Sequence, residues 1–413
     1  MEPVTVPRCS ATVTDHPEST TMILEETPAQ LELRAELRQY YGDLLTPDVR
    51  AALAESLEGG EVWRDVVARM GKDGWLGIGW PTEYGGQGRP ATDQFIFFDE
   101  TRRAGAPFPF VTINTVGPTM MTYGTDEMKS YYLPKILAGE LNFAIGYTEP
   151  QAGTDLANLQ TKAVRDGDEF VINGNKIYTS GANDADYVWL ACRTDAEAPK
   201  HKGISIICVP TTAKGFDWSL ITTVGGLTTT ATYYEDVRVP VTELVGQENE
   251  GWRMITMQLN HERVGLAAWA GLGHKLFQQV VAWARETELD NGKRVIELPW
   301  VQEDLARCDA ELEAMWLLNW RMAVLVAKDE VGAADSSSMK VFGTERLIEI
   351  NRMLQGIVGA AGYLVPGSPG SILGGRLEAN GRQAQINTFG GGVNEVQREI
   401  FAMAGLGMKR DKR

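Results

Sequence analysis

Two short segments of the chain contain the residue types best suited to holding a ligand. The first is the run YTEPQAGTD at residues 147–155, a turn rich in small and hydroxyl-bearing residues. Its backbone N–H groups can hold a pyrophosphate or the edge of a flat ring. The second is the run NGNKIYTS at residues 173–180, which ends in an aromatic ring and a hydroxyl that can meet such a ring. From residue types alone, two ordinary β turns explain these segments equally well.

Metal chemistry finds no support in the sequence. The four cysteines and four histidines are scattered, no pair has metal-ligand spacing, and no HExxH pattern occurs. The cysteines do not suggest a disulfide framework either, so the cytoplasm is the expected compartment. A glycine-rich run at residues 85–88 has no strand–helix context, and a plain loop before a helix explains it better.

Charge and hydropathy exclude two classes of protein. The formal net charge is −16, which repels nucleic acid phosphates and anionic membranes. No apolar run reaches the roughly 18 residues needed to cross a bilayer. Residues 1–27 are polar and do not resemble a signal peptide. We expect them to be a disordered tail, and a chain that begins at Met22 to fold like the whole.

The predicted secondary structure changes twice along the chain. Its 413 residues suggest two or three domains. Helical patterns run through residues 28–140, short strands and turn signals through 141–247, and long helical patterns through 248–413, which gives an α+β fold. Within the β region, the pair Asn173 and Gly174 lies between strand patterns and predicts a hairpin turn.

Together these features resemble the acyl-CoA dehydrogenase family, whose flavin signature typically reads TEPxAGSD. The resemblance covers almost the whole chain and includes the helical–β–helical order and the run DVRVP at residues 236–240. It implies an N-terminal helical domain, a β-barrel-like middle domain and a C-terminal four-helix bundle. It also implies FAD as the cofactor, with the flavin near Tyr178. The residues expected to bind the cofactor are Tyr147, Thr148, Gly153, Thr154, Tyr178 and Ser180. Of these, Gly153 and Thr154 would lie by the phosphates of FAD or by the thioester arm of CoA.

The resemblance also assigns a catalytic base. Removing a proton alpha to a thioester requires a carboxylate in a dry site. In many members it lies near the C-terminus in a motif like YEGTxxIxR, where this chain has Gly391. Members similar to isovaleryl-CoA dehydrogenases carry it after the β domain in a motif like LDxERL, and the run LNHERV places Glu262 there. Arg263 corresponds to the neighbouring arginine that orients the base or the CoA arm. The alternatives are a buried ion pair for Glu262 and a surface salt bridge for Arg263.

Other departures from the family concern its subunit interface. An RxxFG motif normally reaches the FAD of a neighbouring subunit, but no FG follows Arg285. A QIxGGxGY motif does likewise, and here Gly356 replaces its glutamine. The resemblance therefore implies a heterotetramer with a homologous subunit, similar to the actinobacterial enzymes that shorten steroid side chains. Residues 390–392, all glycine, would widen the pocket for a steroid acyl-CoA, unless they only begin a helix.

Two other functions are compatible with the sequence. A catalytically silent subunit would only complete the FAD site of a partner, and Glu262 with the intact TEP turn argues against it. A flavin monooxygenase or oxidase on the same fold tends to lose the carboxylate, and peroxide production would reveal it. For the dehydrogenase, the expected electron acceptor is an electron-transfer flavoprotein.

Overall fold

The computed structural model describes residues 25–55, 59–266 and 269–409, and it describes side chains for all of these except residues 55 and 259–270. Most of the expected tail, residues 1–27, therefore lies outside the described residues. Thr27 belongs to the first helix, because its side chain accepts from the backbone N–H of Gln30 and the Gln30 side chain accepts in return.

The N-terminal domain is helical, as the helical patterns in its sequence predict. A π-helical turn, Thr112–Val116, precedes its fifth helix. Buried aromatic side chains, among them Tyr41, Phe95 and Phe97, form its core. Its helices are α1 (Pro28–Leu44), α2 (Pro47–Glu55), α3 (Glu61–Lys72), α4 (Ala91–Ala104), α5 (Gly117–Tyr123) and α6 (Asp126–Leu137).

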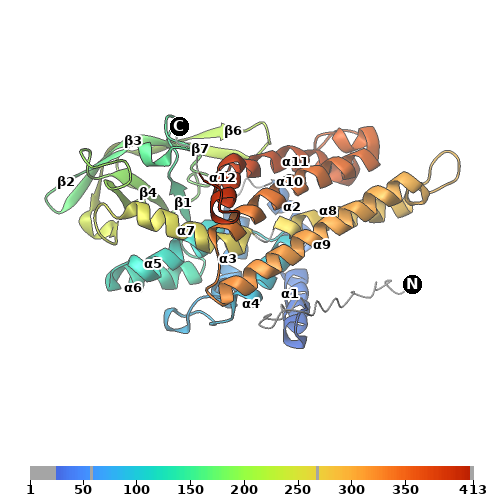
Figure 1. The fold of residues 1–413 in the computed structure, drawn as a ribbon, viewed down its shortest axis with the longest axis horizontal. Helices are drawn as coiled ribbons and strands as arrows, with labels where there is room; N and C mark the ends of the chain where they lie inside the picture. Colours follow the sequence, from blue (N-terminus) through green and yellow to red (C-terminus); the bar gives the residue numbers. More distant parts are fainter. Residues whose placement is uncertain (1–24, 56–58, 267–268, 410–413) are drawn as a thin grey trace.

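The middle domain is one mixed sheet that lies at one end of the molecule (Figure 1). Its order is β6-β7-β3-β2-β4-β5-β8, and β1 pairs with β4 in parallel. The strands are β1 (Phe143–Gly146), β2 (Lys162–Asp166), β3 (Glu169–Ile177), β4 (Tyr187–Arg193), β5 (Ile204–Pro210), β6 (Phe216–Thr222), β7 (Thr228–Pro240) and β8 (Leu244–Val245).

The predicted hairpin turn at Asn173 and Gly174 is wrong. Both residues lie inside β3, at a bulge where its register against β7 shifts, and the turn from β2 to β3 contains Gly167 instead. Gly174 is required for close packing and not for a turn. A Cβ there would lie 2.6 Å from the Thr161 hydroxyl, so the backbones approach too closely for any other residue.

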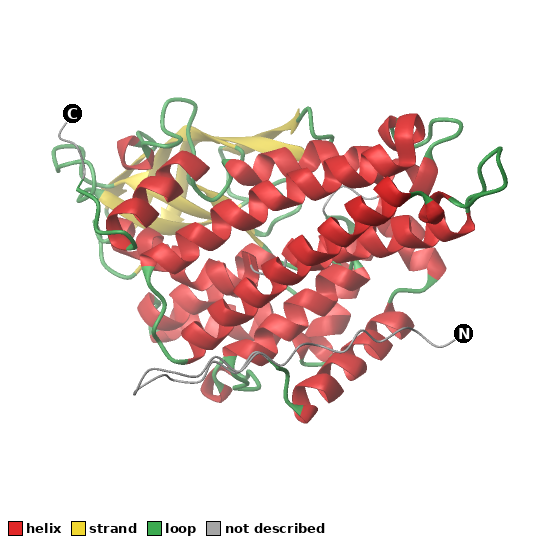
Figure 2. Ribbon diagram, turned by 45° about the vertical axis from the view of Figure 1, so that its right-hand side comes forward, coloured by secondary structure: helices red, strands yellow, loops and turns green. Residues whose placement is uncertain are grey.

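The C-terminal domain is a bundle of long helices, which cover the front of the molecule in Figure 2. Leu312, Met315 and Leu354 are among its fully buried side chains. The helices are α7 (Gly251–Leu266), α8 (Trp269–Glu286), α9 (Pro299–Ala327), α10 (Ala333–Val358), α11 (Arg376–Gln383) and α12 (Asn394–Ala404). Across the described part of the chain, none of the helices combines the length and the apolar character that a bilayer span requires.

Helix α7 joins the three parts of the fold. It packs on β5 of the sheet, on the π-helical turn and α4 of the N-terminal domain, and on α9 of the bundle. In Figure 1 it runs from the sheet toward the long helices. Side chains on this helix can therefore reach a ligand that is bound where the domains meet.

Candidate functional site

The fold brings the two segments that the sequence singles out side by side. The backbone N–H of Ile177 donates to the carbonyl of Thr148 at 2.9 Å, which joins the end of β3 to the turn after β1. The turn closes on itself through two backbone bonds between Glu149 and Ala152, of 3.0 and 3.1 Å. We call residues 147–154 the flavin turn. Its far end, Gly153 and Thr154, is exposed, as the binding of a phosphate or a CoA arm requires.

Tyr178 and Ser180 lie next to this turn with their side chains outward. Tyr178 has a φ of 61° and its side chain is 59% exposed. A tyrosine in left-handed backbone is costly and is usually retained at functional sites. Ser180 is exposed, and its hydroxyl lies 2.9 Å from that of Thr229 on β7. An exposed ring beside an open turn is the arrangement that a flat ligand needs.

A fully buried ion pair between Lys176 and Glu149 holds the flavin turn against the end of β3. The Lys176 ammonium lies 2.8 Å from Glu149 Oε1 and also donates to the carbonyl of Tyr147 at 3.0 Å. The Glu149 carboxylate further accepts from the backbone N–H groups of Gln160 and Thr161 at 2.6 and 2.8 Å. Burial opposes the charge of Glu149, but Lys176 and these donors hold the pKa of its carboxyl below the ordinary value. The pair thus fixes the shape of the turn.

Tyr147 connects the flavin turn to α7. Its hydroxyl donates to Oε1 of Gln258, a buried residue of α7, and accepts from the indole N–H of Trp189 at 3.2 Å. The Nε2 of Gln258 is buried and has no hydrogen-bond partner among the described residues. A buried amide without a partner costs free energy, so it indicates a place where a bound group completes the site.

The predicted base and its neighbour lie on the same helix. Glu262 and Arg263 belong to α7, but their side chains fall outside the described residues. Residue 262 follows Gln258 by four positions, and residues so spaced share one face of an α-helix. The roles of Glu262 and Arg263 stay predictions.

Gly391 lies in a loop between the 3₁₀ helix η9 (Ala384–Thr388) and α12. It is exposed, its φ is 67°, and no atom lies within 4 Å of where its Cβ would be. The space beside Gly391 is therefore open. Phe389, two residues earlier in the same loop, is also exposed, at 57%.

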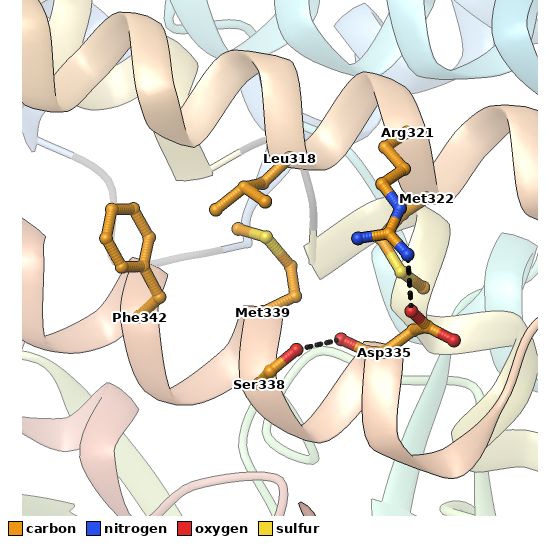
Figure 3. A pocket seen from close by; sticks show the side chains of 7 residues that line it. All are labelled: Leu318, Arg321, Met322, Asp335, Ser338, Met339 and Phe342. Atoms are coloured by element: carbon orange, nitrogen blue, oxygen red, sulfur yellow. Dashed lines mark hydrogen bonds and ion pairs between the residues drawn. The ribbon is translucent and has the colours of Figure 1, made fainter. Parts of the chain in front are cut away.

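Two hollows in the helical bundle are lined by residues of that domain and by none of the flavin turn. The smaller has a volume of about 200 Å³ and lies between α9 and α10, where Arg321 pairs with Asp335 at 3.2 Å beside Met322 and Met339 (Figure 3). It is smaller than most ligand pockets. The larger, about 610 Å³, is lined by Asn351, Gln355 and Tyr363, in the segment that resembles the family's QIxGGxGY motif.

Three residues that shape this site were not predicted from the sequence, namely Glu149, Lys176 and Gln258. Lys176 stands at an inward position of β3, where a charge needs a buried partner, and the TEP motif supplies one. Gln258 lies one helical turn before Glu262, so helical spacing alone could have found it. Within the described residues, no group of three or more His, Cys, Asp or Glu side chains could hold a metal ion.

Comparison with known proteins accounts for this arrangement. Models of the acyl-CoA dehydrogenase N-terminal, middle and C-terminal domains match residues 27–140, 144–237 and 249–406. The chain belongs to the acyl-CoA dehydrogenase family. It is 53% identical to acyl-CoA dehydrogenase FadE26 of Mycobacterium tuberculosis, over 95% of this chain and all of that protein.

Solved structures agree with this assignment. The Tcur3481-Tcur3483 steroid ACAD is 62% identical with a TM-score of 0.89, and the match covers 94% of this chain and all of that one. A chain of the ChsE4-ChsE5 complex from M. tuberculosis is 52% identical with the same TM-score and coverage. These matches confirm the expected fold and the resemblance to steroid acyl-CoA dehydrogenases.

FAD is the cofactor of this family, and the residues present fit it. The flavin turn leaves Gly153 and Thr154 open, the ring of Tyr178 faces outward, and the Gln258 amide lacks a partner beside Tyr147. All six residues predicted to bind FAD lie on the flavin turn or within a few residues of the strand end beside it. Their individual contacts with the cofactor stay predictions.

The unpartnered amide leads to a first prediction. Replacing Gln258 by methionine should weaken FAD binding by about tenfold, because a polar group lost from a dry site costs roughly 1–3 kcal/mol. Titration of the apoprotein with FAD, followed by fluorescence, measures this. The control is Gln302→Met, the same change at an exposed position of α9, which should leave FAD affinity unchanged. Equal FAD affinity in wild type and Gln258→Met would refute the assignment.

Proposed function

We propose that this acyl-CoA dehydrogenase oxidises the steroid side chain of an acyl-CoA thioester, and that Glu262 removes the alpha proton. The observation that carries the proposal is the contact between Tyr147 of the flavin turn and Gln258 of α7. Glu262 lies one helical turn beyond Gln258 on the same helix. The base would thus come from the helix that already touches the cofactor site.

The chain's own residues divide the work as follows. Glu262 takes the proton from the alpha carbon, and Arg263 orients the carboxylate or the CoA arm. Fixed hydrogen-bond donors around the thioester carbonyl increase the acidity of that proton. The flavin turn would hold FAD, which when bound would supply the acceptor, at flavin N5, for the hydride that leaves the beta carbon. The Glu149–Lys176 pair keeps the turn in shape throughout, because neither side chain is exposed to solvent.

The open space at Gly391 supports a bulky substrate. Gly391 stands where many relatives carry the base, and no atom lies within 4 Å of the place that its Cβ would occupy. With the base on α7 and a glycine at position 391, the acyl end of the site would have more room than in relatives that carry a glutamate at that position. Two of the similar solved structures are described as steroid ACAD, which is the substrate class that we propose.

We further propose that the chain works in a heterotetramer with a homologous subunit. In the larger hollow, Gln355 Nε2 donates to the carbonyl of Leu377 at 3.2 Å, so this amide is already engaged within the chain. Gly356 follows it at the position where the resemblance places a glutamine for the neighbour's FAD. Similar solved structures bear paired names, ChsE4-ChsE5 and Tcur3481-Tcur3483. A homologous partner would supply the missing half of the site.

The electron acceptor and the compartment complete the proposal. We propose an electron-transfer flavoprotein as the acceptor of the electrons. Cys192, Cys208 and Cys308 are buried free thiols, which fits a reducing cytoplasm. A silent subunit is the second candidate, and it predicts an intact complex in which Glu262 can be replaced without loss of activity.

A substrate panel tests this function. The chain is expressed alone and with its genomic neighbour of the same family, and mass, FAD per subunit and dye-linked turnover are measured. We expect full FAD binding and turnover only in the pair, with a steroid acyl-CoA preferred over butyryl-CoA by at least about tenfold in kcat/KM. An active homotetramer with one FAD per chain and a preference for short linear acyl-CoAs would overturn both the partner and the substrate.

A further inference from the structure

A single lysine of α10 holds the glycine-containing loop that precedes α12. We call residues 388–393 the glycine loop. The Lys340 ammonium donates to the carbonyl of Thr388 at 3.2 Å, to the carbonyl of Gly392, and to Oδ1 of Asn394 at 2.9 Å. These acceptors lie at the beginning of the loop, at its end and on the first residue of α12. Three donors of one ammonium thus meet three acceptors.

The glycine loop has little else with which to hold its shape. Gly391 and Gly392 have φ values of 67° and 98°, and Phe389 to Gly392 are all exposed. Glycine offers no side chain to pack, and it allows more backbone conformations than any other residue. Backbone bonds from Phe389 and Gly390 to the carbonyl of Ile386, at 3.2 and 2.8 Å, secure only its first residues. Its geometry at Gly391 and Gly392 therefore depends on Lys340.

The start of α12, by contrast, is tied firmly to α10. Asn394 is buried, and its Nδ2 donates to Thr344 Oγ1 at 3.1 Å and to Glu345 Oε1 at 3.2 Å. Arg398 of α12 pairs with Glu345 at 2.6 Å. Removing Lys340 would leave these contacts in place, so α12 should stay docked while the loop before it loosens.

We propose that Lys340 is a positioning residue that fixes the glycine loop and thereby sets the width of the site at its acyl end. This inference rests on the proposed function in one respect, namely that the loop faces the acyl group. The anchoring of the loop itself is independent of any substrate. Lys340 does not touch the reacting atoms in this scheme, and its effect on catalysis passes through the position of Gly391.

The charge of Lys340 gives the anchor a pH dependence. Burial lowers the pKa of the Lys340 ammonium to about 8, against the opposing effect of Glu395 on α12 and Glu345 on α10, the latter shared with Arg398. Below that pH, three N–H donors serve three acceptors. As the pH rises through about 8, the neutral amine keeps only two, so one contact of the loop is lost.

Hydrogen exchange tests the anchor directly. In Lys340→Met, the protection factors of the Phe389 and Gly390 amides, which donate to the carbonyl of Ile386, should fall about tenfold, with little change in α12. In the wild type they should fall across a midpoint near pH 8, and Lys340→Arg should remove that midpoint because arginine stays charged. The matched control is Lys275→Met, which removes a partly buried lysine of α8 that donates to Ala104. Unchanged loop exchange in Lys340→Met would overturn the proposal.

Steady-state kinetics of the complex with its partner test whether Lys340 affects the choice of substrate. We expect KM for a steroid acyl-CoA to rise about tenfold in Lys340→Met with kcat changed less than about threefold, and KM for butyryl-CoA to change less than about twofold. Lys340→Arg should recover part of the loss. If both KM values stay at wild-type level while the loop loosens, the role in specificity is wrong. If the wild type accepts no steroid acyl-CoA, the proposed substrate fails, and loop exchange still decides the anchor.

Discussion

Replacing Glu262 by glutamine should lower kcat by roughly 10³–10⁴-fold while the protein remains folded and yellow. The reason is that the amide keeps the size of the side chain but cannot accept the alpha proton, and a positioned general base typically contributes about 10²–10⁴-fold. Flavin reduction by acyl-CoA, followed in a stopped-flow spectrometer under anaerobic conditions, isolates the chemical step. The spectrum of the resting protein reports whether FAD is still bound.

Two further variants make this result interpretable. His261→Gln changes the adjacent residue, since neighbouring positions of an α-helix are about 100° apart around its axis, and it should leave the reduction rate within about threefold of wild type. Gly391→Glu, combined with Glu262→Gln, places a carboxylate at the position used by other relatives. Open space around Gly391 favours partial rescue, but its φ of 67° opposes it at a cost of about 1–2 kcal/mol. Turnover of Glu262→Gln alone at the wild-type rate would end the assignment of the base.

The domain order could be inferred from the sequence because periodicity reports which faces are buried. The helical–β–helical succession follows from such patterns, whereas the two candidate ligand-binding segments were singled out by residue type and by resemblance to a family motif. The structure brings those segments together through the bond between Ile177 and Thr148. The hairpin at Asn173 and Gly174 was mispredicted because the pair favours a tight turn in isolation. Here a close approach to Thr161, the residue directly before β2, decides its conformation instead. Such a contact is not visible in a local pattern.

Long-range polar contacts were likewise beyond the sequence. The partner of Lys176 is 27 residues away, that of Tyr147 is 111 residues away, and those of Lys340 are about 50 residues away. Nothing in residue spacing relates these positions, because the fold alone brings them together. The catalytic assignment of Glu262 came from resemblance to a family motif, and the contact of Gln258 with the flavin turn adds a physical reason for it.

Replacing Lys176 by methionine should lower the free energy of unfolding by about 3–5 kcal/mol, because it leaves Glu149 charged and buried without its counterion. Methionine nearly preserves the volume, so the loss reports on charge rather than on a cavity. The double variant Lys176→Met with Glu149→Gln should recover most of the stability, since no uncompensated charge remains. Urea unfolding at saturating FAD measures all three proteins. Arg238→Met, which breaks an exposed pair with Asp166, is the control and should change stability little.

The pH dependence separates this explanation from a simple packing defect. In the wild type the pKa of Glu149 is held below its ordinary value, so its stabilising contribution is present above the ordinary carboxyl pKa and is lost as the pH falls through the folded-state value. Without Lys176, burial raises the pKa of Glu149 above its unfolded value, so the variant gains stability as the pH falls and the carboxyl becomes protonated. The difference between variant and wild type should therefore shrink from about pH 7.5 to about pH 5. A packing defect would leave that difference constant with pH.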